Sequence, residues 1–287
     1  MKVNGYYCTL EAISAGDDES QLIILVHGFP DSPKNWQPVI DRLAESGYKV
    51  IAPWLKGYSP SQAIPPFNIG TIGLDIIEIA LNYSGKNKAI IIGHDFGAMG
   101  AYCAANLRGD LFEKIVTMSV PPFGAIFEGF LTTEQLKKSW YIFFHQTFLA
   151  EIVLPMNNFE YIDRLWSDWG PESTPNYKEF TENAKLCFAD PENIQAALGY
   201  YRSIFDLTEN TDNNIAAALS AFQQAVVLPT LYLHGSDDGC IGIEVGNLAS
   251  KYLNNQSKSK IIKNSGHFLQ IDAPTEMLAE INEFLSK

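Results

Sequence analysis

The sequence predicts an α/β fold: a mostly parallel central sheet with helices on both faces and a helical cap inserted between two strands. Short apolar runs recur along the chain, and they are continuous rather than alternating, as in strands buried on both faces. Segments with helical periodicity separate these runs. One long interval, from about 121 to 224, has no convincing strand, and the cap is expected there.

The apolar runs and the helical patterns alternate in a fixed order. The runs expected to form parallel strands are 22–26, 49–52, 88–92, 114–119, 229–233 and 259–263. The stretch MKVNGYYCTLEAISAG at the N-terminus alternates like a strand. Helical patterns lie over roughly 35–46, 71–84, 97–108, 242–254 and 275–286. Because ligands of such sheets bind outside the carboxyl ends of the strands, residues directly after each run are candidates for a site.

The interval without strands is rich in aromatic residues and is punctuated by Pro, Asn and Asp. Pro121 and Pro122 mark its start, because proline cannot continue a central strand. The predicted domains are therefore a core of residues 1–120 and 225–287 and a helical cap of residues 121–224. The cap is expected to cover the strand ends as a lid.

Composition limits the partners of this chain of 287 residues. The formal net charge of −13 disfavours nucleic acid and anionic membranes. The four cysteines are scattered and form no C-x-x-C pair, so neither a zinc site nor a disulfide framework is predicted. The N-terminus lacks the apolar segment of a signal peptide, and no apolar run approaches the roughly 18 residues of a membrane span. We therefore expect a soluble cytoplasmic protein, a monomer or a homodimer.

The stretch IIGHDFGAMG, residues 91–100, is the first candidate for chemistry. Gly93 and Gly97 allow a strand to turn tightly into a helix, which lifts Asp95 above the sheet. In a G-x-S-x-G nucleophile elbow this position holds serine. The helix that follows favours an anion at its N-terminus. An aspartate before a helix is also a common N-cap, so the residues alone leave that alternative open.

Two further loops follow predicted strands at the same edge. In HGFPDS, residues 27–32, Gly28 permits a close backbone approach, and the N–H of Phe29 is expected to form an oxyanion hole with that of Phe96. In NSGHFLQIDAP, residues 264–274, His267 follows the last strand and precedes the final helix. This is the last place in the chain order nucleophile, acid, histidine, so His267 is predicted to be the general base.

The acid that orients this histidine is expected in LHGSDDGCIG, residues 233–242. A carboxylate is needed there to hold the imidazole tautomer and to stabilise the imidazolium. Asp237 and Asp238 are both available, and the spacing alone does not separate them.

Together these segments resemble the α/β-hydrolase fold, and within it the soluble epoxide hydrolases. HGFPDS, LKGYSPS at 55–61, GHDFGA at 93–98, HGSDDGCI at 234–241 and SGHFLQID at 265–272 carry the resemblance, which spans nearly the whole chain. It implies a cap after the sixth strand. It also implies that Asp95 is the nucleophile, Asp238 the acid, by its spacing from Gly235, and His267 the base.

The resemblance also implies two cap tyrosines that donate to the epoxide oxygen. SWYIFFHQTFLAE at 139–151 suggests Tyr141, and LGYYRSIF at 198–205 suggests Tyr201. Trp36 and Phe144 are expected to line the substrate pocket. Pro33 departs from the pattern, because many relatives have another aromatic residue there.

An aspartate at the elbow suits a substrate without a carbonyl. A carboxylate displaces the strained oxygen of an epoxide directly and forms a covalent ester, whose carbonyl belongs to Asp95. Water activated by His267 then attacks that carbonyl and releases a vicinal diol, with no metal and no cofactor. The expected partner is a small apolar epoxide.

Two other functions remain alternatives. Haloalkane and haloacid dehalogenases share the aspartate nucleophile. The haloalkane branch typically has tryptophan after the nucleophile, where this chain has Phe96, and the fluoroacetate type needs an arginine beside the nucleophile, where this chain has none. The second alternative is a non-catalytic receptor for small molecules on the same fold.

Overall fold

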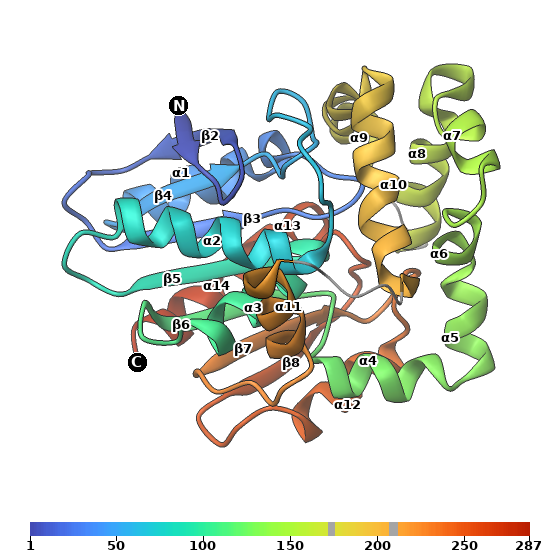
Figure 1. Cartoon of the computed structure of the whole chain (residues 1–287). Helices are drawn as coiled ribbons and strands as arrows, with labels where there is room; N and C mark the ends of the chain where they lie inside the picture. The colour runs from blue at the N-terminus through green and yellow to red at the C-terminus, as the bar shows by residue number, and fades with distance from the viewer. Residues whose placement is uncertain (172–175, 207–211) are drawn as a thin grey trace.

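A mostly parallel sheet lies at the centre of the computed structural model, which describes residues 1–171, 176–206 and 212–287 (Figure 1). Its eight strands have the order β1-β2-β4-β3-β5-β6-β7-β8. The strands are β1 Lys2–Asn4, β2 Thr9–Ala15, β3 Leu22–Val26, β4 Lys49–Pro53, β5 Ala89–His94, β6 Phe112–Met118, β7 Thr230–Gly235 and β8 Lys258–Ile262. Neighbouring strands from β4 to β8 pair in parallel, which confirms the predicted fold class.

The central strands consist of buried apolar residues because helices cover both faces of the sheet. Every residue of β3 and β5 is buried. The alternating segment at the N-terminus forms two strands instead of one, because the chain turns back at Gly5, whose N–H donates to the carbonyl of Cys8. β1 and β2 are antiparallel to each other, and β2 pairs antiparallel to β4 at the edge of the sheet.

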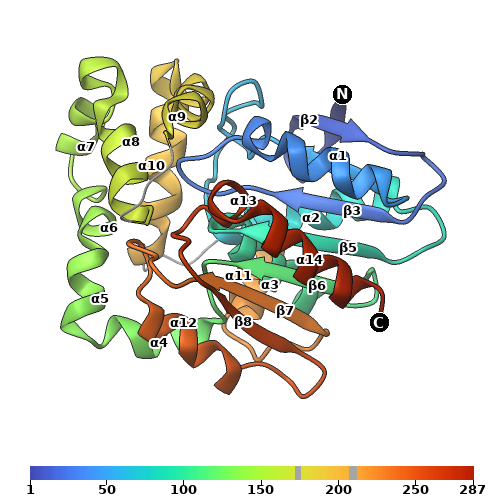
Figure 2. The same cartoon turned by 180° about the vertical axis from the view of Figure 1, so that it is seen from behind.

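Helices α2 (Ile69–Tyr83), α3 (Phe96–Leu107) and α11 (Asn213–Phe222) cover one face of the sheet (Figure 1). Helices α1 (Gln37–Glu45) and α14 (Pro274–Leu285) cover the other face (Figure 2). Two predicted helices are shorter than expected. The 35–46 segment begins as the 3-10 helix Pro33–Trp36, and the 242–254 segment divides into α12 (Ile243–Leu248) and the 3-10 helix Ala249–Lys251.

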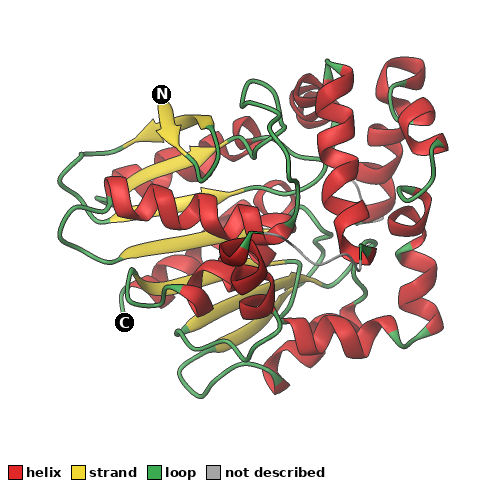
Figure 3. Cartoon of the chain, viewed as in Figure 1, coloured by secondary structure: helices red, strands yellow, loops and turns green. Residues whose placement is uncertain are grey.

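Between β6 and β7 the described part of the chain contains helices and no strand, and all of these helices except the last, α11, gather beyond the carboxyl ends of the strands (Figure 3). They are α4 Phe123–Phe130, α5 Thr133–Lys138, α6 Trp140–Phe144, α7 Leu149–Val153, α8 Met156–Trp169, α9 Lys178–Lys185, the 3-10 helix Leu186–Phe188, α10 Pro191–Phe205 and α11. The helical run of α8 is interrupted at Asn157–Phe159, where φ is positive.

Helix α11 falls inside the predicted cap interval but packs against the core helices α2 and α3. We therefore infer that the cap comprises α4 to α10 and that the core resumes at α11 rather than at residue 225. None of the helices in the described ranges combines the length and the apolar character needed to cross a bilayer.

Candidate active site

Asp95 stands in the turn between β5 and α3, as the sequence predicts. Its backbone has φ 53° and ψ −120°, an unfavourable conformation for a residue with a side chain. The turn is tight because Gly97 packs against the backbone of Val26, where a Cβ atom would collide with the Val26 carbonyl. Asp95 occupies the N-cap position of α3, but its side chain makes no capping hydrogen bond to the helix, so the carboxylate is not used as a cap. Strain of this kind is found at functional sites, where the rest of the fold enforces it.

The loop after β3 holds one oxygen of the Asp95 carboxylate. The N–H of Phe29 donates to Asp95 Oδ1 over 2.8 Å. Gly28 makes this approach possible, because a Cβ atom there would collide with the Asp95 side chain. The N–H of Phe96, the other expected donor, opens helix α3 and makes no hydrogen bond to the Asp95 side chain.

His267 lies between two carboxylates. Its Nδ1 atom is 3.0 Å from Asp238 Oδ2, and its Nε2 atom is 3.5 Å from Asp95 Oδ2. The other Asp238 oxygen accepts the N–H groups of Cys240 and Ile241, over 2.7 and 2.9 Å. Asp238 is therefore buried and fully engaged.

Asp237, the other candidate for the acid, differs from Asp238 in exposure and in hydrogen-bond partner. Its side chain is exposed and accepts a hydrogen bond from Ser236 Oγ over 3.0 Å. The geometry thus brings Asp238, and not Asp237, to the imidazole.

Asp95, Asp238 and His267 are buried together, and each stabilises the charged form of its neighbour. Burial raises the pKa of Asp95 and of Asp238, but the neighbouring His267 outweighs it, so both pKa values lie below their usual range. Burial lowers the pKa of His267, but Cys240 and the carboxylates of Asp238 and Asp95 outweigh it, so this pKa lies well above its usual range. These shifts favour an imidazolium between two carboxylates in the resting site.

The cap places Tyr141 of α6 and Tyr201 of α10 opposite Asp95. Both side chains are buried, and their rings meet edge to face with centroids 5.7 Å apart. Burial raises the pKa of both phenols well above the usual value, so both keep their protons. Tyr141 Oη lies 3.2 Å from Cys240 Sγ. The two cap segments therefore present hydroxyl donors beside the carboxylate.

A cavity of about 270 Å³ adjoins these groups. Its polar lining residues are Asp95, Tyr141 and Tyr201. The rest of the wall is apolar and consists of Phe96, Met99, Val120, Phe123, Ile126, Phe127, Phe130, Ile142, Ile204, Phe205, Phe222 and Ile241. A carboxylate at the end of an apolar cavity suits a small apolar ligand with one reactive polar centre.

Two residues expected in the substrate pocket lie outside this cavity. Trp36 is fully buried in the core cluster that includes α1, and its Nε1–H donates to Asp31 Oδ2 over 2.9 Å. Phe144 packs between other cap residues, with its ring 5.7 Å from that of Tyr161. The pocket prediction is corrected for both: α4, α10 and α11 supply much of the apolar wall instead.

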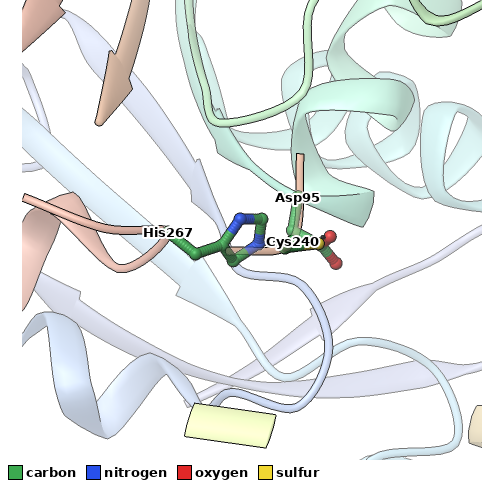
Figure 4. A group of neighbouring side chains, drawn as sticks. All are labelled: Asp95, Cys240 and His267. Atoms are coloured by element: carbon green, nitrogen blue, oxygen red, sulfur yellow. Dashed lines mark ion pairs between the residues drawn. The ribbon is translucent and has the colours of Figure 1, made fainter. Parts of the chain in front are cut away.

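Two neighbours of the imidazole escaped the sequence analysis. The main-chain carbonyl of Trp169, at the end of α8, accepts the main-chain N–H of His267 over 2.9 Å and that of Gly239 over 3.4 Å. Cys240 is buried beside His267 and Asp95, and one ligand-capable atom from each of the three lies within 4.8 Å of the others (Figure 4). For Cys240, its position two residues after the predicted acid could have indicated that it lies near the site. Nothing in the sequence indicated that Trp169 does.

Comparison with known proteins agrees with the fold and identifies the family. Residues 21–274 match the alpha/beta hydrolase fold family. Human epoxide hydrolase 4 is 27% identical over 272 residues, which cover 91% of this chain and 71% of that protein. Epoxide hydrolase A of Mycobacterium tuberculosis is 24% identical over 306 residues, covering 96% of this chain and 94% of that protein.

The fold comparison extends over the whole chain. The crystal structure of epoxide hydrolase A from Mycobacterium thermoresistibile superposes with a TM-score of 0.82 at 23% identity, covering 100% of this chain and 97% of that one. The chain therefore belongs to the alpha/beta hydrolase fold family and is an epoxide hydrolase-like member of it.

Proposed function

We propose that this protein hydrolyses small apolar epoxides to vicinal diols through a covalent ester on Asp95. One observation carries the proposal: a carboxylate, rather than a hydroxyl, stands on the elbow and shares an otherwise apolar cavity with two buried tyrosines. A carboxylate attacks an sp³ carbon, and protonated phenols stabilise the oxygen that leaves it. The sequence similarity to proteins named epoxide hydrolases supports the same substrate class.

In the first step Asp95 Oδ2 attacks an epoxide carbon. The N–H of Phe29 holds Oδ1, so the attacking oxygen is the one that lies free of this bond. Tyr141 and Tyr201 donate hydrogen bonds to the epoxide oxygen as its bond to the attacked carbon breaks. The opened oxygen stays on the neighbouring carbon and takes a proton from one phenol, which is then reprotonated from solvent, so the product is a hydroxy ester of Asp95. The high pKa values of the two tyrosines make them hydrogen-bond donors at neutral pH rather than anions.

In the second step water hydrolyses the ester. Esterification removes the charge of Asp95, one of the carboxylates that stabilise the imidazolium of His267, and so favours the neutral imidazole that acts as base. His267, oriented by Asp238 over 3.0 Å, deprotonates a water that attacks the ester carbonyl. The N–H groups of Phe29 and Phe96 stabilise the oxyanion, each contributing about 3 kcal/mol. As the oxyanion collapses, the ester C–O bond breaks and His267 returns its proton to the departing diol oxygen, which frees the Asp95 carboxyl group.

The test is the intact mass of a His267→Gln variant after incubation with small aryl and alkyl epoxides. Without the base the ester forms but does not hydrolyse, so the mass increases by one whole epoxide, localised to the peptide that contains Asp95. The matched control is Asp95→Asn, which forms no adduct. A parallel incubation with alkyl bromides distinguishes the dehalogenase alternative, since it adds the alkyl group alone. No adduct from either set of compounds would contradict the proposal.

A further inference from the structure

Cys240 has no part in the reaction proposed above, yet its thiol lies among the reacting groups. The side chain is 1% exposed, and its Sγ atom is 3.2 Å from Tyr141 Oη. Asp95, Cys240 and His267 form a group of potential metal ligands, the one such group found in the described part of the chain (Figure 4). No spacing in the sequence reveals this group, because its members come from three separate loops.

The imidazole of His267 already has the arrangement of a metal ligand. Its Nε2 atom is fully buried and makes no hydrogen bond to any described residue. It faces Asp95 Oδ2 at 3.5 Å, in an ion pair that a bound cation would replace. Its Nδ1 atom is held by Asp238. Histidines that bind metals typically have the second ring nitrogen held by a carboxylate in this way, which fixes the tautomer and the orientation.

Asp95 presents a single free oxygen toward the same place. Oδ1 is occupied by the N–H of Phe29, and Oδ2 lies 3.5 Å from His267 Nε2. In a tetrahedral zinc site with bonds of about 2.0–2.1 Å, nitrogen and oxygen ligands lie about 3.3–3.5 Å apart. This separation fits without rearrangement.

The sulfur needs only a small adjustment. The three ligand atoms lie within 4.8 Å of one another. A Zn–S bond of about 2.3 Å places sulfur about 3.5 Å from the other ligands, so each distance from Sγ must shorten by at most about 1.3 Å, a shift that side-chain rotation supplies. Asp95 lines the cavity, which gives an ion a route to the site.

We propose that Asp95 Oδ2, Cys240 Sγ and His267 Nε2 bind one thiophilic divalent cation of the Zn²⁺ type, and that this cation inhibits the enzyme. Two protons are released to solvent, one from the Cys240 thiol and one from Nε2 of the His267 imidazolium, so the imidazole binds in its neutral form, and water occupies the fourth position. A thiolate ligand selects zinc-like ions over Mg²⁺ and Ca²⁺. The bound ion occupies the carboxylate oxygen and the ring nitrogen that the reaction uses, so ion and substrate compete. The inhibition rests on the proposed function, whereas the binding does not.

The test begins with the wild-type protein, freed of metal by a chelator. Equilibrium dialysis is expected to give one Zn²⁺ per chain, and Co²⁺ as a replacement is expected to show the near-ultraviolet charge-transfer band of a cobalt–thiolate bond. Cys240→Ser is expected to lose this band and to weaken zinc binding by about 100-fold or more. The matched control is Cys8→Ser, which removes the half-buried thiol of the N-terminal hairpin and leaves band and affinity unchanged. Asp238→Asn is expected to weaken binding by about 10- to 100-fold through the orientation of His267.

A cobalt complex without a thiolate band, or zinc affinity unchanged in Cys240→Ser, would overturn the proposal. Because the band is read on the wild-type protein, a folding defect in a variant does not decide the result. Epoxide hydrolysis with and without Zn²⁺ separates the two proposals. If epoxides are hydrolysed and zinc neither binds nor inhibits, the metal site alone fails. If zinc binds as described and no epoxide reacts, the proposed function alone fails.

Discussion

The main-chain N–H of Phe29 and the Oδ1 atom of Asp95 are joined by a hydrogen bond of 2.8 Å, which orients the carboxylate before any substrate arrives. This orientation depends on Gly28, since a Cβ atom at that position would collide with the Asp95 side chain. The position of the proposed nucleophile is thus set by a residue that carries no reactive group.

Gly28→Ala is accordingly expected to displace the Asp95 carboxylate and to lower kcat/KM for an epoxide by about 100-fold, the effect of a shift of roughly 1 Å in a reacting group. Steady-state kinetics measures the loss, and thermal unfolding shows that the fold persists. Wild-type turnover in a folded Gly28→Ala protein would contradict this account of the elbow.

Asp238→Asn is expected to lower turnover by about 10⁴-fold, because an amide in place of the carboxylate favours the wrong tautomer of His267. Asp237→Asn, next to it in the chain but exposed, provides the matched control and is expected to change turnover by less than about twofold. Comparable losses in the two variants would mean that the acid is assigned wrongly.

Tyr201→Phe is expected to slow ester formation by about 100-fold, since it removes a hydroxyl that we propose donates to the opening epoxide. Tyr200→Phe is the control, because that hydroxyl is buried but donates to the Lys56 carbonyl over 2.9 Å, away from the cavity. It is expected to lower the free energy of unfolding by about 1 kcal/mol and to leave the reaction rate unchanged. Single-turnover kinetics separates ester formation from ester hydrolysis, and equal rates in Tyr201→Phe and wild type would exclude Tyr201 as a donor.

The protein is expected to lose stability below about pH 6. Burial lowers the pKa of His27 to about 4, and of His94 and His145 to about 3. Between these values and about 6.5 the unfolded chain binds more protons than the folded chain, so the free energy of unfolding falls as the pH falls. Burial raises the pKa of Asp31 and of Asp75 to about 6, which opposes this trend but involves fewer groups and smaller shifts.

His145→Gln tests the effect at a single residue. Glutamine can still accept the hydrogen bond of 2.9 Å from Tyr161 Oη, but it does not titrate. Between pH 7 and pH 5 this variant is expected to lose roughly 2 kcal/mol less of its free energy of unfolding than the wild type. Urea unfolding at the two pH values gives the comparison, and parallel losses in both proteins would show that His145 is not the group responsible.

The sheet and the elbow could be predicted because their determinants are local. A continuous apolar run such as β3 is dictated by its burial on both faces, and the turn at Asp95 is encoded by the glycines on either side. The cap boundary was harder to predict. Helix α11 has an apolar face like those of the cap helices, and its packing against α2 and α3 depends on tertiary contacts that periodicity does not contain.

Within the site, the sequence could not choose between Asp237 and Asp238, because adjacent turn residues differ only in which one the folded loop directs inward. Trp36 was misplaced for a related reason: an aromatic residue after an active-site loop can face the cavity or the core, and here its N–H bonds to the buried Asp31. Trp169 was missed because its contribution is a main-chain carbonyl, which every residue possesses.

The main-chain carbonyl of Trp169 has a consequence for the evolution and engineering of this scaffold. It accepts main-chain N–H groups from His267 and from Gly239, so a cap helix holds both the loop of the proposed base and the loop of the proposed acid. The base is therefore positioned partly by the cap, and a transplanted cap with ideal substrate contacts but no acceptor at this point would leave the histidine poorly fixed. Exchange of caps between related enzymes is expected to succeed only when the donor helix ends with a carbonyl in the same place.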